Sequence, residues 1–188
     1  MSLLKTIFAS VFSSAPASTK ATVSDPLSPQ DILAFHDLIA TGAAQEVATA
    51  LRTTPALATA ADQYGFQAIH LLDYEEFHEK LALLLKAGAD INAANDEGHT
   101  LLHVLIEPSF LSTLIHGGAK VDARDKFGRT PLMVHLTEPD GLAFLTGFLD
   151  AGANPNAKDN DGRSVLGYAK AHRDRTGETI LRQAGARD

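Results

Sequence analysis

Apolar residues in this chain recur in short runs with the spacing of amphipathic helices, and turn residues separate the runs. The clearest helix start is Ser28-Pro-Gln-Asp31, a capping Ser followed by Pro and an acidic residue in the first turn. Gly42 is expected to end that helix, whose apolar residues are Ile32, Leu33, Phe35, Leu38 and Ile39. Further helices are predicted at about 43–53, 67–73, 76–86 and 109–116. The pattern predicts an all-α protein.

A nine-residue motif recurs four times between these helices. Its most regular copy, at 125–133, reads Asp-Lys-Phe-Gly-Arg-Thr-Pro-Leu-Met, and altered copies lie at 62–70, 95–103 and 159–167. The shared glycines are separated by 33, 30 and 34 residues; they are Gly65, Gly98, Gly128 and Gly162. A second marker containing Gly-Ala keeps the same phase at 87–90, 117–120, 151–154 and 184–187. A fixed period of this length predicts a solenoid of stacked units.

Each position of the motif has a physical role. The Asp side chain can accept backbone N–H groups and close a tight turn, and the Gly can take a positive φ. Thr130 can cap the next helix, with Pro131 at the first helical position. The glycine of the second marker fits a left-handed residue that ends the second helix. The predicted unit is a turn, a helix, a short return, a second helix and a long turn.

These residues resemble the ankyrin repeat, whose usual signature is Asp-x-x-Gly-x-Thr-Pro-Leu-His. The resemblance covers about residues 62–188 and, by extension, 28–61. It implies an ankyrin-repeat solenoid of helix-turn-helix units with hairpin loops, in which His70 and His103 tie neighbouring loops by hydrogen bonds. The repeats are expected at about 28–61, 62–94, 95–124, 125–158 and 159–188, the outer two acting as caps.

The chain also departs from the signature. Gln67-Ala68 and Ser164-Val165 replace Thr-Pro, and Met133 and Gly167 replace the His. The poorest helix cap is therefore predicted at Gln67, because its side chain is not a common capping group.

The 188 residues carry a net charge of −7, spread unevenly. Residues 25–116 hold 13 acidic and 3 basic side chains, net −10, whereas residues 117–188 are net +1 and residues 1–24 are net +2. The acidic half either solubilises the surface or steers a basic partner toward it. Direct binding to nucleic acid is not expected, because the sequence has no coherent basic stripe.

Residues 1–27 form a separate N-terminal segment. An apolar helical face, Leu3, Leu4, Ile7, Phe8, Val11 and Phe12, precedes a Ser/Ala/Thr linker. One interpretation is a helix that docks on the solenoid or frays. A second is a secretory signal ending near Ala15-Pro-Ala17, which would make the protein periplasmic or secreted rather than cytoplasmic. A third is membrane contact through residues 1–15.

Metal-site and catalytic chemistry find little support in the sequence. The absence of Cys excludes disulfides and thiolate chemistry. His99 and His103 are four residues apart, but His99 precedes the helix, and the carboxylates around His78 would fan around a helix axis. The calcium-loop resemblance of residues 159–162 fails, because Ala157 and Tyr168 occupy positions that need carboxylates. No cofactor, metal or catalytic residue is predicted.

The resemblance implies that partners bind along the hairpin tips and first helices, which line a concave face. The residues at these positions are Gln63, Tyr64, Phe66, Tyr74, Asp96, Glu97, His99, Lys126, Phe127, Arg129, Asn160, Asp161 and Arg163. Aromatic residues at turn tips either anchor an interface or pack on the next hairpin.

The expected function is therefore non-catalytic protein binding by a chain that is monomeric on its own. A sharper hypothesis is an inhibitor or immunity-type protein for a basic toxin or enzyme. The alternatives are an exported or membrane-associated protein directed by its N-terminal segment, and, less favoured, a metal-binding or enzymatic protein.

Overall fold

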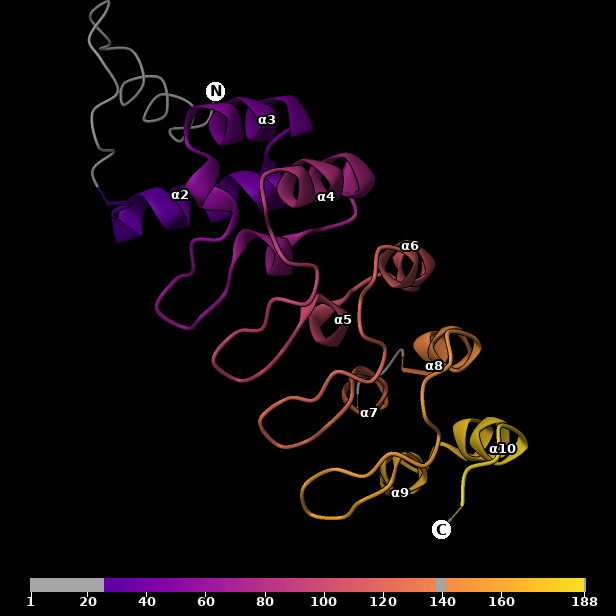
Figure 1. The fold of residues 1–188 in the computed structure, drawn as a ribbon. Helices are drawn as coiled ribbons and strands as arrows, with labels where there is room; N and C mark the ends of the chain where they lie inside the picture. The colour runs from indigo at the N-terminus through magenta and orange to yellow at the C-terminus, as the bar shows by residue number, and fades with distance from the viewer. Residues whose placement is uncertain (1–25, 138–140, 188) are drawn as a thin grey trace, which may run out of the picture.

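The computed structural model describes residues 26–137 and 141–187, and in these residues helices are paired in units that stack into a solenoid (Figure 1). Its elements are α2 (Pro29–Thr41), α3 (Ala44–Thr53), η1 (Pro55–Ala58), η2 (Ala68–Leu71), α4 (Phe77–Lys86), α5 (Leu101–Val104), η3 (Pro108–Phe110), α6 (Leu111–His116), α7 (Pro131–His135), α8 (Gly141–Asp150), α9 (Val165–Ala171) and α10 (Arg175–Gln183), where η denotes a 3-10 helix. Hairpin loops project from one side of the stack, and α4, α6, α8 and α10 line the other (Figure 1). The predicted all-α ankyrin-repeat solenoid is confirmed.

The first helix begins and ends where the sequence predicts. The Asp31 N–H donates to Ser28 Oγ at 3.2 Å, and the Ser28 N–H donates to Asp31 Oδ2 at 2.9 Å, which completes a capping box. Gly42 is the C-terminal cap of α2. Of the apolar residues on this helix, Phe35 and Ile39 are buried in the core, whereas Leu33 is exposed to solvent.

The first helices of the second and third units are only four residues long, and in the second unit this is shorter than predicted. The expected helix at 67–73 is the four-residue 3-10 helix η2, after which Leu72 is extended with ψ 124°. The Gln67 side chain makes no capping hydrogen bond, as predicted, and the Thr100 side chain caps no helix N–H either. In both units a histidine compensates: the Gln67 N–H donates to His70 Nδ1 at 3.0 Å, and the Thr100 N–H donates to His103 Nδ1 at 3.1 Å.

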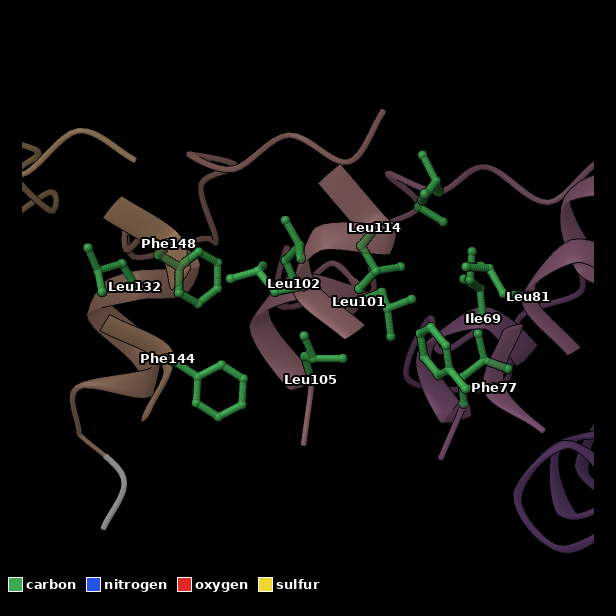
Figure 2. Close-up of a cluster of buried hydrophobic side chains, with 14 of the residues drawn as sticks. Ile69, Phe77, Leu81, Leu101, Leu102, Leu105, Leu114, Leu132, Phe144 and Phe148 are labelled. Carbon is green, nitrogen blue, oxygen red and sulfur yellow. The ribbon is translucent and has the colours of Figure 1, made fainter. Parts of the chain in front are cut away.

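A continuous apolar core runs through the stack. Figure 2 shows it as a row of side chains from successive units, labelled Ile69, Phe77, Leu81, Leu101, Leu102, Leu105, Leu114, Leu132, Phe144 and Phe148. Ring stacking links the second helices: Phe77 and Phe110 have centroids 3.9 Å apart. Because each unit buries its apolar faces against its neighbours, stability depends on contacts between units.

The hairpin turns are closed by a recurring hydrogen-bond pattern. Asp125 Oδ1 accepts the N–H groups of Phe127 and Arg129 at 2.9 and 2.8 Å. The side-chain oxygens of the residues at the same place in the other three hairpins each accept two N–H groups in the same way; they are Asp62, Asn95 and Asp159. The predicted role of the motif Asp is confirmed.

Neighbouring hairpins are joined through their backbones. The N–H groups of Asp96, Lys126 and Asn160 donate to carbonyls of the preceding hairpin at 2.8–3.1 Å. This close approach requires glycine: a Cβ on Gly98, which has φ +80°, would lie 2.9 Å from Asp125 Cα and from Lys126 N. Gly162 has nearly the same φ of +79°, but nothing lies within 4 Å of its virtual Cβ.

A second set of contacts joins the long turns that follow the second helices. Asn92 donates through Nδ2 to Gly118 O at 3.0 Å and accepts the Lys120 N–H at 2.8 Å. Asn156 repeats this arrangement with the carbonyl of Gly185 and the N–H of Arg187. The units are therefore tied at the hairpins and again at the long turns.

The first unit lacks a hairpin and is joined to the second by charged side chains instead. Lys80 is fully buried; its Nζ donates to Ile39 O at the end of α2 at 2.8 Å and lies 3.5 Å from Asp73 Oδ1. Glu76 Oε2 accepts the Ala44 N–H at the start of α3 at 2.6 Å. A cation therefore lies at one helix C-terminus and an anion at the next N-terminus, as the helix dipoles favour.

The contrast between two hairpin glycines yields a stability prediction. Gly98→Ala and Gly162→Ala both place a side chain at positive φ, which costs about 1–2 kcal/mol. Only the first also pushes against the backbone of the next hairpin, so it should destabilise by about 1–3 kcal/mol more. Urea unfolding of both variants measures the difference, and equal losses would contradict the proposed role of close hairpin packing.

Candidate protein-binding surface

Twelve of the predicted site residues lie together on the hairpins, in the two positions before each motif glycine and the one after it. We call this set the hairpin row: Gln63, Tyr64, Phe66, Asp96, Glu97, His99, Lys126, Phe127, Arg129, Asn160, Asp161 and Arg163. All are exposed or half-buried. The turn is held by the motif Asp or Asn and by backbone groups, so these side chains are free to differ between units.

Two aromatic rings of the hairpin row face solvent. Tyr64 is 61% exposed and Phe127 is 50% exposed. Two cations border the Phe127 ring, Lys126 Nζ 5.0 Å and Arg129 Cζ 4.9 Å from its centroid. Phe66 differs, because it is half-buried and packs edge-on against His70 at 5.7 Å. Tyr64 and Phe127 therefore offer accessible apolar area, whereas Phe66 belongs partly to the fold.

Two polar side chains of the hairpin row, Arg129 and His99, lie beside Asp125. Its buried carboxylate accepts the Arg129 Nε–H at 2.7 Å, and His99 Nε2 lies 3.5 Å from the same oxygen, Oδ2. Burial alone would raise the pKa of Asp125, but the hydrogen bonds from Arg129 outweigh it and the pKa is lowered. The ionised carboxylate thus holds the Arg129 side chain in place beside the Phe127 ring.

The remaining polar contacts of the row link neighbouring units. Lys126 forms an ion pair with Glu97 of the preceding hairpin, and Asn160 Nδ2 donates to Lys126 O at 3.0 Å. In the last unit, burial and the Asp159 carboxylate, which accepts the Tyr168 O–H at 2.7 Å, raise the pKa of Tyr168 to about 12. These contacts stiffen the surface on which exposed side chains are presented.

One predicted site residue lies apart from the others. Tyr74 follows η2 in the loop leading to α4, beyond the hairpin, and is 66% exposed. In the next unit Ile106, which sequence reasoning did not select, is 64% exposed in the corresponding loop. A signal for Ile106 existed in the nearby Pro108, since proline disfavours helix in the residue before it and the extended loop keeps Ile106 out of the core.

The predicted role of the two signature histidines is confirmed. His70 Nε2 lies 3.0 Å from Ala93 O, and His103 Nε2 lies 3.3 Å from Arg129 O in the next hairpin. Burial lowers the pKa of His70, and it lowers the pKa of His103 to about 4. Both rings act as neutral connectors between segments.

Two properties of residues 26–137 and 141–187 bear on other functions. No group of three or more His, Asp or Glu side chains is arranged to hold a metal ion there. Within the same residues, no helix combines the length and apolar character needed to cross a membrane. The predicted N-terminal segment lies almost wholly outside the described residues.

The chain resembles several known proteins, although no protein-family model matches it. It is 35% identical over 97 residues to ankyrin repeat and SOCS box protein 6 of Homo sapiens, covering 49% of this chain and 23% of that protein. It is 36% identical over 124 residues to the B-cell lymphoma 3 protein homolog of Mus musculus, covering 62% and 28%. It is 29% identical over 163 residues to intracellular phospholipase A2 of Caenorhabditis elegans, covering 81% and 15%. The matched region thus spans between 15% and 28% of the length of each of these relatives.

Fold and hairpin geometry define a repeat solenoid with a variable surface. With the similarity to these relatives, they show that the chain is an ankyrin-repeat solenoid that resembles ankyrin-repeat proteins over about half or more of its length. Ankyrin-repeat modules generally mediate protein–protein interactions and are typically non-catalytic, although one distant relative is a phospholipase by name.

The buried histidines predict a loss of stability in mild acid. The unfolded chain takes up protons on histidine near pH 6.5, whereas folded His103 does so only near pH 4. The contribution of His103 to the free energy of unfolding is therefore fully present above about pH 6.5. It is lost as the pH drops toward 4, by up to about 3 kcal/mol.

The measurement is the free energy of unfolding in urea across that pH range. His103→Gln should lower stability at neutral pH but flatten its dependence on pH, whereas His172→Gln, which removes an exposed histidine, should leave the slope unchanged. If the free energy of unfolding of the His103→Gln variant fell with pH as steeply as that of the parent protein, His103 would not be the cause of the loss of stability.

Proposed function

We propose that this protein is a non-catalytic binding module that recognises a protein partner through the hairpin row and the adjoining concave face. The observation that carries the proposal is the exposure of Tyr64 and Phe127 on hairpins that the side chains of Asp62 and Asp125 hold by hydrogen bonds. Rigid aromatic residues supply most of the affinity in many interfaces, because they bury large apolar areas at small entropic cost. Phe127 is further suited to this role by Lys126 and Arg129, which fix its surroundings.

The charge of the partner follows from the acidic half of the chain. Of the three basic residues among 25–116, Lys80 is buried, which leaves Arg52 and Lys86 as the exposed cations in its described part. Most of the acidic side chains there are exposed. A basic surface on the partner would therefore be attracted, and the association rate should fall as salt rises.

A finer form of the proposal is that the protein inhibits a basic toxin or enzyme. The acidic surface and the aromatic hairpin tips support it, since both are suited to covering a basic surface. Capture from the native host with the intact chain, eluted in rising salt, tests this form. One stoichiometric basic partner would support an inhibitor, whereas several partners would favour a scaffold.

Substitution of the two exposed rings tests the binding face itself. Tyr64→Ala combined with Phe127→Ala should weaken affinity for the captured partner at least about tenfold, because anchor residues lose their buried area. Stability should change little, since both side chains are exposed. Leu142→Ala, an exposed apolar residue on α8 along the other side of the stack, is the matched control. Unchanged affinity of the double variant, by calorimetry, would exclude the hairpin row as the binding face.

A further inference from the structure

Two neighbouring loops form an apolar surface that is separate from the hairpin row. Residues 72–76 connect η2 to α4, and residues 105–107 connect α5 to η3. We call these two loops the ledge. Tyr74 and Ile106 are the most exposed large hydrophobic side chains of the described residues, at 66% and 64%. Neither side chain belongs to the apolar core, so folding does not explain why they are apolar.

The two loops of the ledge lie side by side because the helices that follow them pack together. Phe77 stacks on Phe110 immediately after the loops, and His78 Nε2 lies 3.1 Å from Thr113 Oγ1. Packed helices are about 8–10 Å apart, and loops that lead into them have a similar separation. One bound segment of a few residues can therefore contact both Tyr74 and Ile106.

Carboxylates surround this apolar area. Glu75, Glu76 and Glu79 are exposed on one side, and Glu107 lies next to Ile106. The nearby cation, Lys80, is buried; its Nζ donates to Ile39 O and pairs with Asp73 of the ledge at 3.5 Å, so it offsets Asp73 but is not paired with the exposed Glu75 or Glu79. The ledge thus combines exposed apolar groups with a net negative charge, which is complementary to a segment that is apolar and basic.

The backbone of the ledge is also available for binding. Leu72 and Leu105 are extended, with ψ 124° and 127°, and their side chains are buried, so the residues after them are turned outward. Within the described chain, the N–H groups of Tyr74, Ile106 and Glu107 have no hydrogen-bond acceptor. Exposed, unpaired amides of an extended segment can pair with an extended chain from another protein.

We propose that the ledge binds a short extended segment of a protein partner in which apolar residues alternate with lysine or arginine. Its apolar side chains lie against Tyr74 and Ile106, its cations face Glu75 and Glu107, and its carbonyls accept the free N–H groups. This is a second binding surface, beyond the hairpin row, and its occupant is defined by extended backbone and positive charge.

The test uses the full chain, isotope-labelled for NMR, and a soluble peptide of about twelve residues that alternates valine with lysine. Saturable shifts should concentrate at residues 72–76 and 105–107. Tyr74→Ser combined with Ile106→Ser should weaken the peptide at least about tenfold, whereas Leu142→Ala should not. A peptide with glutamate in place of lysine should not bind. Shifts spread over the acidic surface, or equal binding by the Ser double variant, would overturn the proposal.

A second measurement asks whether the ledge is open in the free protein. Because the chain contains no cysteine, Ile106→Cys introduces a single reporter thiol. Fast labelling of that thiol supports an open ledge, and protection would overturn the proposal by indicating that the chain's own N-terminal segment covers it. The Tyr64→Ala/Phe127→Ala variant should bind the peptide like the parent, so a failure of the ledge and a failure of the hairpin row can be told apart.

Discussion

The stack depends on one small arrangement: a side-chain oxygen closes each hairpin from within, and a glycine leaves room for the next hairpin outside it. Asp125 is the clearest case, because its buried carboxylate satisfies two N–H groups and the Arg129 side chain at once. Burying a charge is costly unless it is fully hydrogen-bonded, and here the bonds suffice to lower the pKa of the carboxyl group. Without the glycine, the backbone bond from Lys126 to Glu97 would have no space to form.

This arrangement separates folding from recognition. The groups that close a hairpin are the motif Asp or Asn, the glycine and the backbone, so the turn itself does not require the exposed side chains at its tip, such as Tyr64 and Phe127. Tyr64 and Phe127 can therefore face solvent without loss of the core, and charged residues can replace them in other units. In the acidic half, residues 25–116, the buried Lys80 joins the first two units. Because this cation is buried, the exposed surface of that half remains negative.

The parts of the fold that follow from short-range chemistry could be predicted from sequence. The Ser28 cap, the positive-φ glycines and the bridging histidines each depend on a few consecutive residues, and each is present. Features set by distant partners were out of reach. The sequence alone does not show that Lys80 is buried, because its burial depends on the C-terminal end of α2, whose Ile39 carbonyl accepts its Nζ–H. Nor does the apolar pattern show which residues of α2 are buried: Phe35 and Ile39 are, and Leu33 is not. The exposure of Ile106 is a different case, because it depends on where the four-residue helix α5 ends, for which the nearby Pro108 is a local signal. The positions of the hairpin row could be predicted from the sequence. Which of its aromatic rings are exposed could not, because that depends on whether a ring packs against another side chain, as Phe66 does against His70.

The positive-φ glycines that end the second helices add a rule about length. From each of Gly88, Gly118 and Gly152 to the next hairpin glycine the chain always takes 10 residues, whereas the path from a hairpin glycine to the following helix-ending glycine takes 20 to 24. The shortest path belongs to the unit whose second helix, α6, has six residues instead of ten. Differences in unit length therefore fall in the helical part of the unit, while the path from the end of a second helix to the tip of the next hairpin has the same length in each of these units. Such a molecule can change the size of its units in evolution without shifting the register of the residues it presents to a partner.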